Sequence, residues 1–151
     1  MMKKTYAALT MVLLCLLPFL SACEDDVTST YNYMVVAAYY SPNDPETEKI
    51  AKAIVAYQTK KGLLDKPFKE SVKKEHLTDQ EREELDKKAG ERAMMRLSDM
   101  DFARIVRDAG ITVSETQPTV TIAYKIGYPT TDGGLISAHS LLLQITPDRL
   151  K

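Results

Sequence analysis

The sequence predicts an α+β fold: a two-layer sandwich in which two or three helices cover one face of a mainly antiparallel sheet of three to four strands. Three observations lead to this prediction. Residues 31–40 favour a strand, the segments after them place apolar residues at helical spacing, and two alternating segments joined by a turn close the chain. The expected element order is β-α-α-(α)-β-β, in a single globular domain spanning 31–151.

The predicted first strand, 31–40 (YNYMVVAAYY), is rich in β-forming residues and carries no charge. It is apolar on both faces around Val35 and Val36, which is typical of a central or well-covered strand. The following segment, 41–45, contains two prolines and ends the strand.

A first helix is predicted from Pro45 to Lys61. Asp44 can cap it, proline suits its first position, and Gly62 is a natural terminator. Its expected apolar stripe consists of Ile50, Ala53, Ile54 and Tyr57.

Residues 63–77 are expected to form a linker with room for one short helical turn. Pro67 interrupts the segment, and lysines crowd it. The lysines are Lys66, Lys69, Lys73 and Lys74.

Thr78 and Glu81 form a capping box that predicts the start of a long helix. The segment 98–101 resembles a second cap, so we expect a break there and a shorter helix that ends at Gly110. The long helix should bury Leu85, Ala89, Ala93 and Leu97, and the shorter one Phe102, Ile105, Val106 and Ala109.

A β-hairpin is predicted at the end of the chain. Segments 118–128 and 135–146 place apolar residues at alternate positions, and Asp132-Gly133-Gly134 between them is a sequence typical of turns. The expected core-facing residues are Val120, Ile122, Tyr124, Ile126 and Tyr128 on the first strand, and Leu141, Leu143 and Ile145 on the second.

Residues 1–22 have the layout of a secretory signal peptide. Lys3 and Lys4 precede an uncharged, mostly apolar stretch, 7–20, and two small residues follow it. This stretch is shorter than the roughly 20 residues that a membrane-spanning helix needs. An uncleaved membrane anchor is the alternative, and so is an ordinary signal peptide followed by a chance cysteine.

The segment Leu20-Ser21-Ala22-Cys23 resembles the lipobox of bacterial lipoproteins. The resemblance implies cleavage before Cys23, lipid on Cys23, and attachment to the membrane through that lipid. Beyond this motif, the layout is similar to that of small lipoproteins of unknown function in Bacteroidota-like bacteria. Cys15 would leave with the signal peptide, so the exported chain would have no free thiol.

Residues 23–30 are expected to form a polar tether that begins with the lipidated cysteine. Its acidic run, Glu24-Asp25-Asp26, is either a solvated spacer or a signal that resembles the surface-export signals of Bacteroidota lipoproteins. We therefore expect a location at the outer membrane, on its periplasmic or its cell-surface face.

Composition excludes several functional classes. The net charge of −1 does not favour a nucleic-acid partner, and two cysteines in 151 residues do not form a disulfide scaffold. His76 and His139 have no second histidine or cysteine at ligand spacing, so we predict no metal and no cofactor. No catalytic constellation is visible, and the sequence indicates no oligomeric state.

A possible binding face consists of Tyr31, Tyr33 and Tyr39 in the first predicted strand. Exposed tyrosines can stack on glycans or contact proteins. The alternative is that these rings pack against the sheet, since tyrosine favours strands.

The expected function is that of a lipid-anchored interaction or accessory module, not an enzyme, that contacts an envelope protein, a glycan or a peptide. One alternative is a small-ligand carrier with a pocket between sheet and helices near Met94, Met95 and Met100. The other is a small envelope hydrolase with an unrecognised site.

Overall fold

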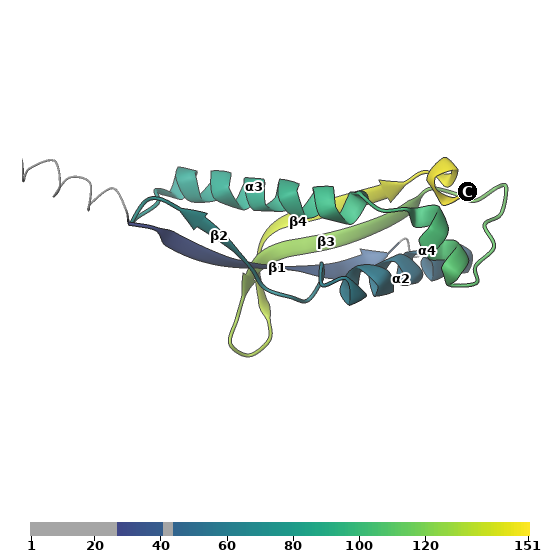
Figure 1. Cartoon of the computed structure of the whole chain (residues 1–151), viewed down its shortest axis with the longest axis horizontal. Helices are drawn as coiled ribbons and strands as arrows, with labels where there is room; N and C mark the ends of the chain where they lie inside the picture. Colours follow the sequence, from purple (N-terminus) through teal and green to yellow (C-terminus); the bar gives the residue numbers. More distant parts are fainter. Residues whose placement is uncertain (1–26, 41–43) are drawn as a thin grey trace, which may run out of the picture.

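The fold is α+β, as predicted. The computed structural model describes residues 27–40 and 44–151 (Figure 1). A four-stranded antiparallel sheet has the order β2-β1-β3-β4. In chain order the elements are β1 (Ser29–Tyr40), α2 (Pro45–Lys60), β2 (Phe68–Val72), α3 (Asp79–Ser98), α4 (Phe102–Asp108), β3 (Val120–Pro129), β4 (Leu135–Ile145) and the 3₁₀ turn η1 (Pro147–Leu150).

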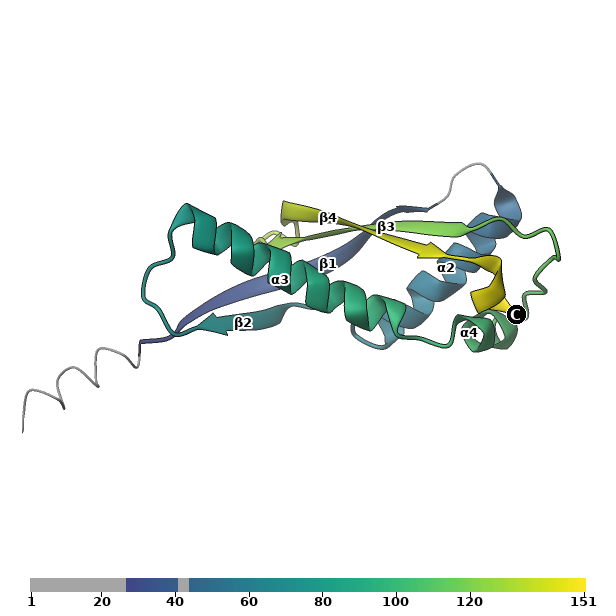
Figure 2. The same cartoon turned by 90° about the horizontal axis from the view of Figure 1, so that it is seen from above.

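The helices lie along different halves of the sheet. In Figures 1 and 2, α3 lies beside one half of the elongated molecule, and α2 and α4 lie beside the other half. Tyr124 of β3 bonds to Gln58 of α2, and Tyr128 bonds to Asp86 of α3. These tyrosines are four residues apart on one strand and share a face. Both helices therefore cover the same face of the sheet.

The linker prediction for 63–77 is wrong in its middle part. Residues 68–72 form β2, which pairs with the first half of β1, so the observed order is β-α-β-α-α-β-β. The Phe68 ring stacks on Tyr33 at 5.8 Å between centroids. Glu70 is the buried residue of the strand, whereas Phe68 and Val72 are half-buried. A charged residue at a buried position hides the apolar alternation by which a strand is recognised.

The helix boundaries follow the predicted capping residues. Asp44 accepts a hydrogen bond from the Glu46 amide, and α2 ends one residue before the expected Lys61. Thr78 and Glu81 form the predicted capping box, and Asp101 caps α4 after the expected break. These local signals therefore place the helices correctly.

The core lies between the sheet and the helices. Ile50 and Ile54 of α2, together with Leu97 of α3, pack towards the predicted core-facing residues of β3. Leu141 is half-buried, whereas Leu143 and Ile145 are buried. The hairpin thus uses the face that its alternation predicts.

A β-bulge interrupts the hairpin next to Gly127. Ile126 pairs with His139, but Gly127 pairs with Ser137, so Ala138 is the extra residue on β4. A Cβ atom on Gly127 would overlap the carbonyl group of Ile136. The close approach of the two strands therefore requires glycine at this position.

Within 27–40 and 44–151, no helix combines the length and the apolar character needed to cross a bilayer.

Candidate ligand-binding site

Tyr33, one residue of the possible binding face, is fully buried beneath α3. Its hydroxyl donates a hydrogen bond to Asp86 Oδ1 at 2.7 Å, and the hydroxyl of Tyr128 donates to the same oxygen. Burial, reinforced by the Asp86 carboxylate, raises the pKa of both tyrosines. Both hydroxyls therefore keep their protons and act as donors to Asp86.

Tyr31 also faces α3, where its half-buried ring contacts Arg82. The Arg82 guanidinium lies 4.1 Å from the Tyr31 ring centroid and 4.6 Å from that of Tyr128. The same side chain donates from Nε to the Tyr128 hydroxyl at 3.1 Å. Tyr31 and Tyr33 thus contact α3 and do not form an exposed binding face. The side chain of Tyr39 lies outside the described residues.

Other residues singled out in the sequence lie apart from this cluster or outside the described residues. Cys23 lies outside the described residues. His76 is exposed, 3.9 Å from the Glu75 carboxylate, and His139 lies beside Gly90 of α3. No group of three His, Cys, Asp or Glu side chains within 27–40 and 44–151 could hold a metal ion.

Sequence reasoning missed a cavity of about 280 Å³ between the α2–β2 loop, β2 and the second half of α3. We call it the cationic cavity. Its apolar lining is Val35, Leu63, Pro67, Phe68 and Ala93, and its charged lining is Lys66, Lys69, Glu70, Arg92 and Arg96.

The α2–β2 loop forms one wall of the cationic cavity. Gly62 and Asp65 adopt positive φ angles of 76° and 59°, and the Asp65 amide donates to the Val35 carbonyl at 2.9 Å. Leu64 between them is buried and anchors the loop in the core. A left-handed aspartate costs backbone energy that the surrounding contacts must offset. The loop is therefore held in one conformation, and it carries Lys66 at the cavity.

An ion pair between Glu70 and Arg92 joins the two other walls of the cavity, β2 and α3. The Glu70 carboxylate, whose side chain is 11% exposed, accepts a hydrogen bond of 2.5 Å from Arg92 Nη1. This contact neutralises one charge pair and holds the Arg92 guanidinium at the cavity. Buried carboxylates require such a partner.

Lys66 and Arg96 give the cavity an excess of positive charge. Neither forms an ion pair with a residue of the described part of the chain. Lys66 lies across Gly62, with its Cδ 3.5 Å from where a Cβ of that glycine would stand. Lys69 follows the alternation of β2 and points away from the face of Glu70, so it lines the cavity chiefly through its backbone.

A second, more open cavity of about 480 Å³ shares Leu63 and Arg96 with the cationic cavity. Met100 lines it, as the carrier alternative expects for that residue. Met95 instead is 70% exposed, and Met94 packs against the core. Of the three methionines, the structure therefore brings only Met100 to this opening.

The sequence contained one signal for the cationic cavity. Arg92 and Arg96 are spaced i, i+4 and so share one side of α3. The signal is incomplete because the sequence of 63–77 predicts a linker, whereas the fold of this segment brings Lys66 and Glu70 to the same cavity.

Comparison of the chain with protein-family models, with curated proteins and with solved structures finds no match.

Proposed function

We propose that this chain is a lipid-anchored protein of the bacterial cell envelope that acts as an interaction or accessory module. The observation that carries the proposal is the segment Leu20-Ser21-Ala22-Cys23 at the end of a signal-peptide layout. Lipid on Cys23 holds the protein at the outer membrane, on the periplasmic or the cell-surface face. The module works by binding and not by catalysis.

The position of β1 supports this arrangement. β1 begins at Ser29, six positions after Cys23, at the end of the molecule opposite the C terminus (Figure 1). Six residues span at most about 20 Å when fully extended. The domain would therefore stand close to the membrane with this end towards it.

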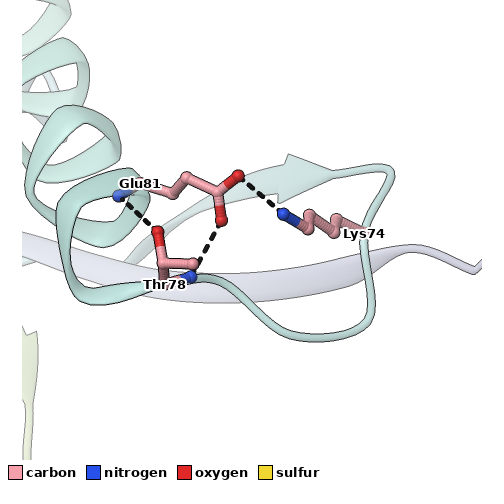
Figure 3. Close-up of polar contacts among 3 residues, drawn as sticks. All are labelled: Lys74, Thr78 and Glu81. Atoms are coloured by element: carbon pink, nitrogen blue, oxygen red, sulfur yellow. Dashed lines mark hydrogen bonds and ion pairs between the residues drawn. The ribbon is translucent and has the colours of Figure 1, made fainter.

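The same end of the domain is braced by polar contacts. Ser29 Oγ donates to the Lys74 carbonyl at 2.6 Å and so ties the start of β1 to the β2–α3 connection. Lys74 Nζ donates to Glu81 Oε1 at 2.6 Å, next to the reciprocal bonds between Glu81 and Thr78 (Figure 3). The start of β1, where the tether would join the domain, is thus connected through Lys74 to both β2 and α3.

The cationic cavity supports binding as the activity. It lies between the α2–β2 loop, β2 and the second half of α3, and charged side chains line it together with apolar ones. Pockets of this kind bind small molecules. Carriage of a small ligand is therefore the second candidate function, and the shared boundary of the two cavities at Leu63 and Arg96 favours it.

A pair of cysteine variants tests the anchor. The full chain is produced in a bacterium that processes lipoproteins, and the cells are fed a labelled fatty acid. Cys23→Ala should lose the label and leave the membrane fraction. Cys15→Ala should keep the label, because Cys15 lies within the segment that is removed. Label retained by Cys23→Ala would refute lipid attachment at that residue.

A further inference from the structure

We propose that the cationic cavity binds a small molecule that carries a carboxylate or phosphate group on a body no larger than a monosaccharide. This inference does not depend on the lipid anchor, since it rests on Val35 and on residues 62–70 and 92–96. The two proposals can therefore fail separately.

The charges around the cavity favour an oxyanion. Lys66, Arg92 and Arg96 contribute three positive charges, and Glu70 is the one carboxylate in its lining. Glu70 is already bonded to Arg92 through Nη1, so it does not compensate Lys66 or Arg96. An anionic ligand would supply the missing counter-charge.

The arrangement of the cations suits a group with two or more oxygens. Arg92 and Arg96 lie one turn apart on α3, and Lys66 approaches from the loop opposite. Guanidinium groups bind carboxylate and phosphate through paired N–H bonds, whereas an ammonium acts as a point charge. An oxyanion between the helix and the loop could therefore contact all three side chains.

The size and floor of the cavity limit the rest of the ligand. Its volume of about 280 Å³ is at the lower end for small-molecule sites. The floor is formed by Val35, Leu63 and Ala93, with Phe68 at one side, and can pack against the nonpolar face of a ring. A sugar acid or a sugar phosphate combines these properties.

The loop is already in the conformation that binding requires. Leu64 is buried, and the Asp65 amide is bonded to Val35, so the wall that carries Lys66 is fixed before any ligand arrives. Preorganisation of this kind lowers the entropic cost of binding.

The test uses three probes with the same hexose body. The full-length chain, ¹⁵N-labelled and in detergent micelles, is titrated with glucose, glucuronate and glucose 6-phosphate while amide resonances are followed. At least one of the two anions should give saturable shifts at 62–70 and 92–96, and glucose should give none. Glucuronate alone would assign a carboxylate, and glucose 6-phosphate alone would assign a phosphate.

Matched variants show whether the cavity is the binding site. Lys66→Gln and Arg96→Gln should each weaken binding of the anion about tenfold, the usual effect of losing one charged hydrogen bond. Arg107→Gln is the control, because Arg107 is exposed on α4 and forms no ion pair with the described residues. Absence of saturable binding by both anions, equal binding of glucose, or an equal loss in Arg107→Gln would overturn the proposal.

Discussion

Glu70 of β2 and Arg92 of α3 are joined by a charged hydrogen bond of 2.5 Å, which connects an edge strand to the longest helix of the described residues. The carboxylate is nearly buried, whereas the guanidinium is largely exposed. The contact thus satisfies a group that would otherwise be left without a partner inside the protein. It also fixes one cation of the cationic cavity.

Arg92→Ala is therefore expected to destabilise the fold. Loss of the partner leaves Glu70 buried and unpaired, and because Arg92 is well solvated we expect a cost of about 1 kcal/mol in the free energy of unfolding. Urea denaturation measures it. Arg107→Ala should change stability by less than about 0.5 kcal/mol, as exposed residues usually do. Equal stability of the two variants would show that the ion pair does not contribute.

Gly127→Ala is expected to be one of the more damaging single changes in the sheet. The new Cβ would overlap the Ile136 carbonyl, which is backbone and can move only if the bulge is rebuilt. The expected cost is about 2–3 kcal/mol, typical of overpacking. Gly110→Ala is the control: Gly110 has a φ of 74° but open space around it, so only backbone strain of about 1 kcal/mol applies. A smaller loss at Gly127 than at Gly110 would contradict the described bulge.

The tyrosine pair predicts instability at high pH. Burial and the nearby Asp86 carboxylate raise the folded-state pKa of Tyr33 and Tyr128 above the ordinary value of 10.0. A raised pKa contributes stability that is fully present below the unfolded value of 10.0 and is lost as pH rises above it. The free energy of unfolding should therefore fall above pH 10, because the two hydroxyls ionise more readily in the unfolded chain than in the folded protein.

Tyr33→Phe separates this effect from general alkaline denaturation. The variant loses a hydrogen bond to Asp86, at a cost of about 1 kcal/mol near neutral pH, and its stability should depend less on pH above 10. Tyr57→Phe, at a half-buried ring on α2, is the control. Ultraviolet absorbance of phenolate, followed together with circular dichroism, measures both properties. An unchanged alkaline transition in Tyr33→Phe would contradict the assignment.

The fold could be predicted from sequence wherever its signals are local. Asp44, the Thr78–Glu81 box and the alternation of β3 lie within a few residues of what they determine. β2 was not predicted, because Glu70 is at a buried position and its partner Arg92 is 22 positions away. A long-range partner of this kind cannot be read from a short window of sequence.

The cationic cavity escaped prediction for a related physical reason. Its loop depends on Asp65, which adopts a left-handed backbone conformation. Because non-glycine residues rarely adopt this conformation, the sequence does not predict it. The tyrosines illustrate the opposite difficulty. Their residue type permits both packing and binding, and the contact of Tyr33 with Asp86, 53 positions away, decides between them.

Lipid attachment is tested most directly by intact-mass spectrometry of the protein extracted from the outer-membrane fraction of the bacterial cells that produce it. We predict a chain that begins at Cys23 and is heavier than residues 23–151 by the mass of its acyl groups, with fragmentation placing the added mass on Cys23. A chain that begins at another residue, or that carries an unmodified Cys23, would contradict a lipid-anchored envelope module.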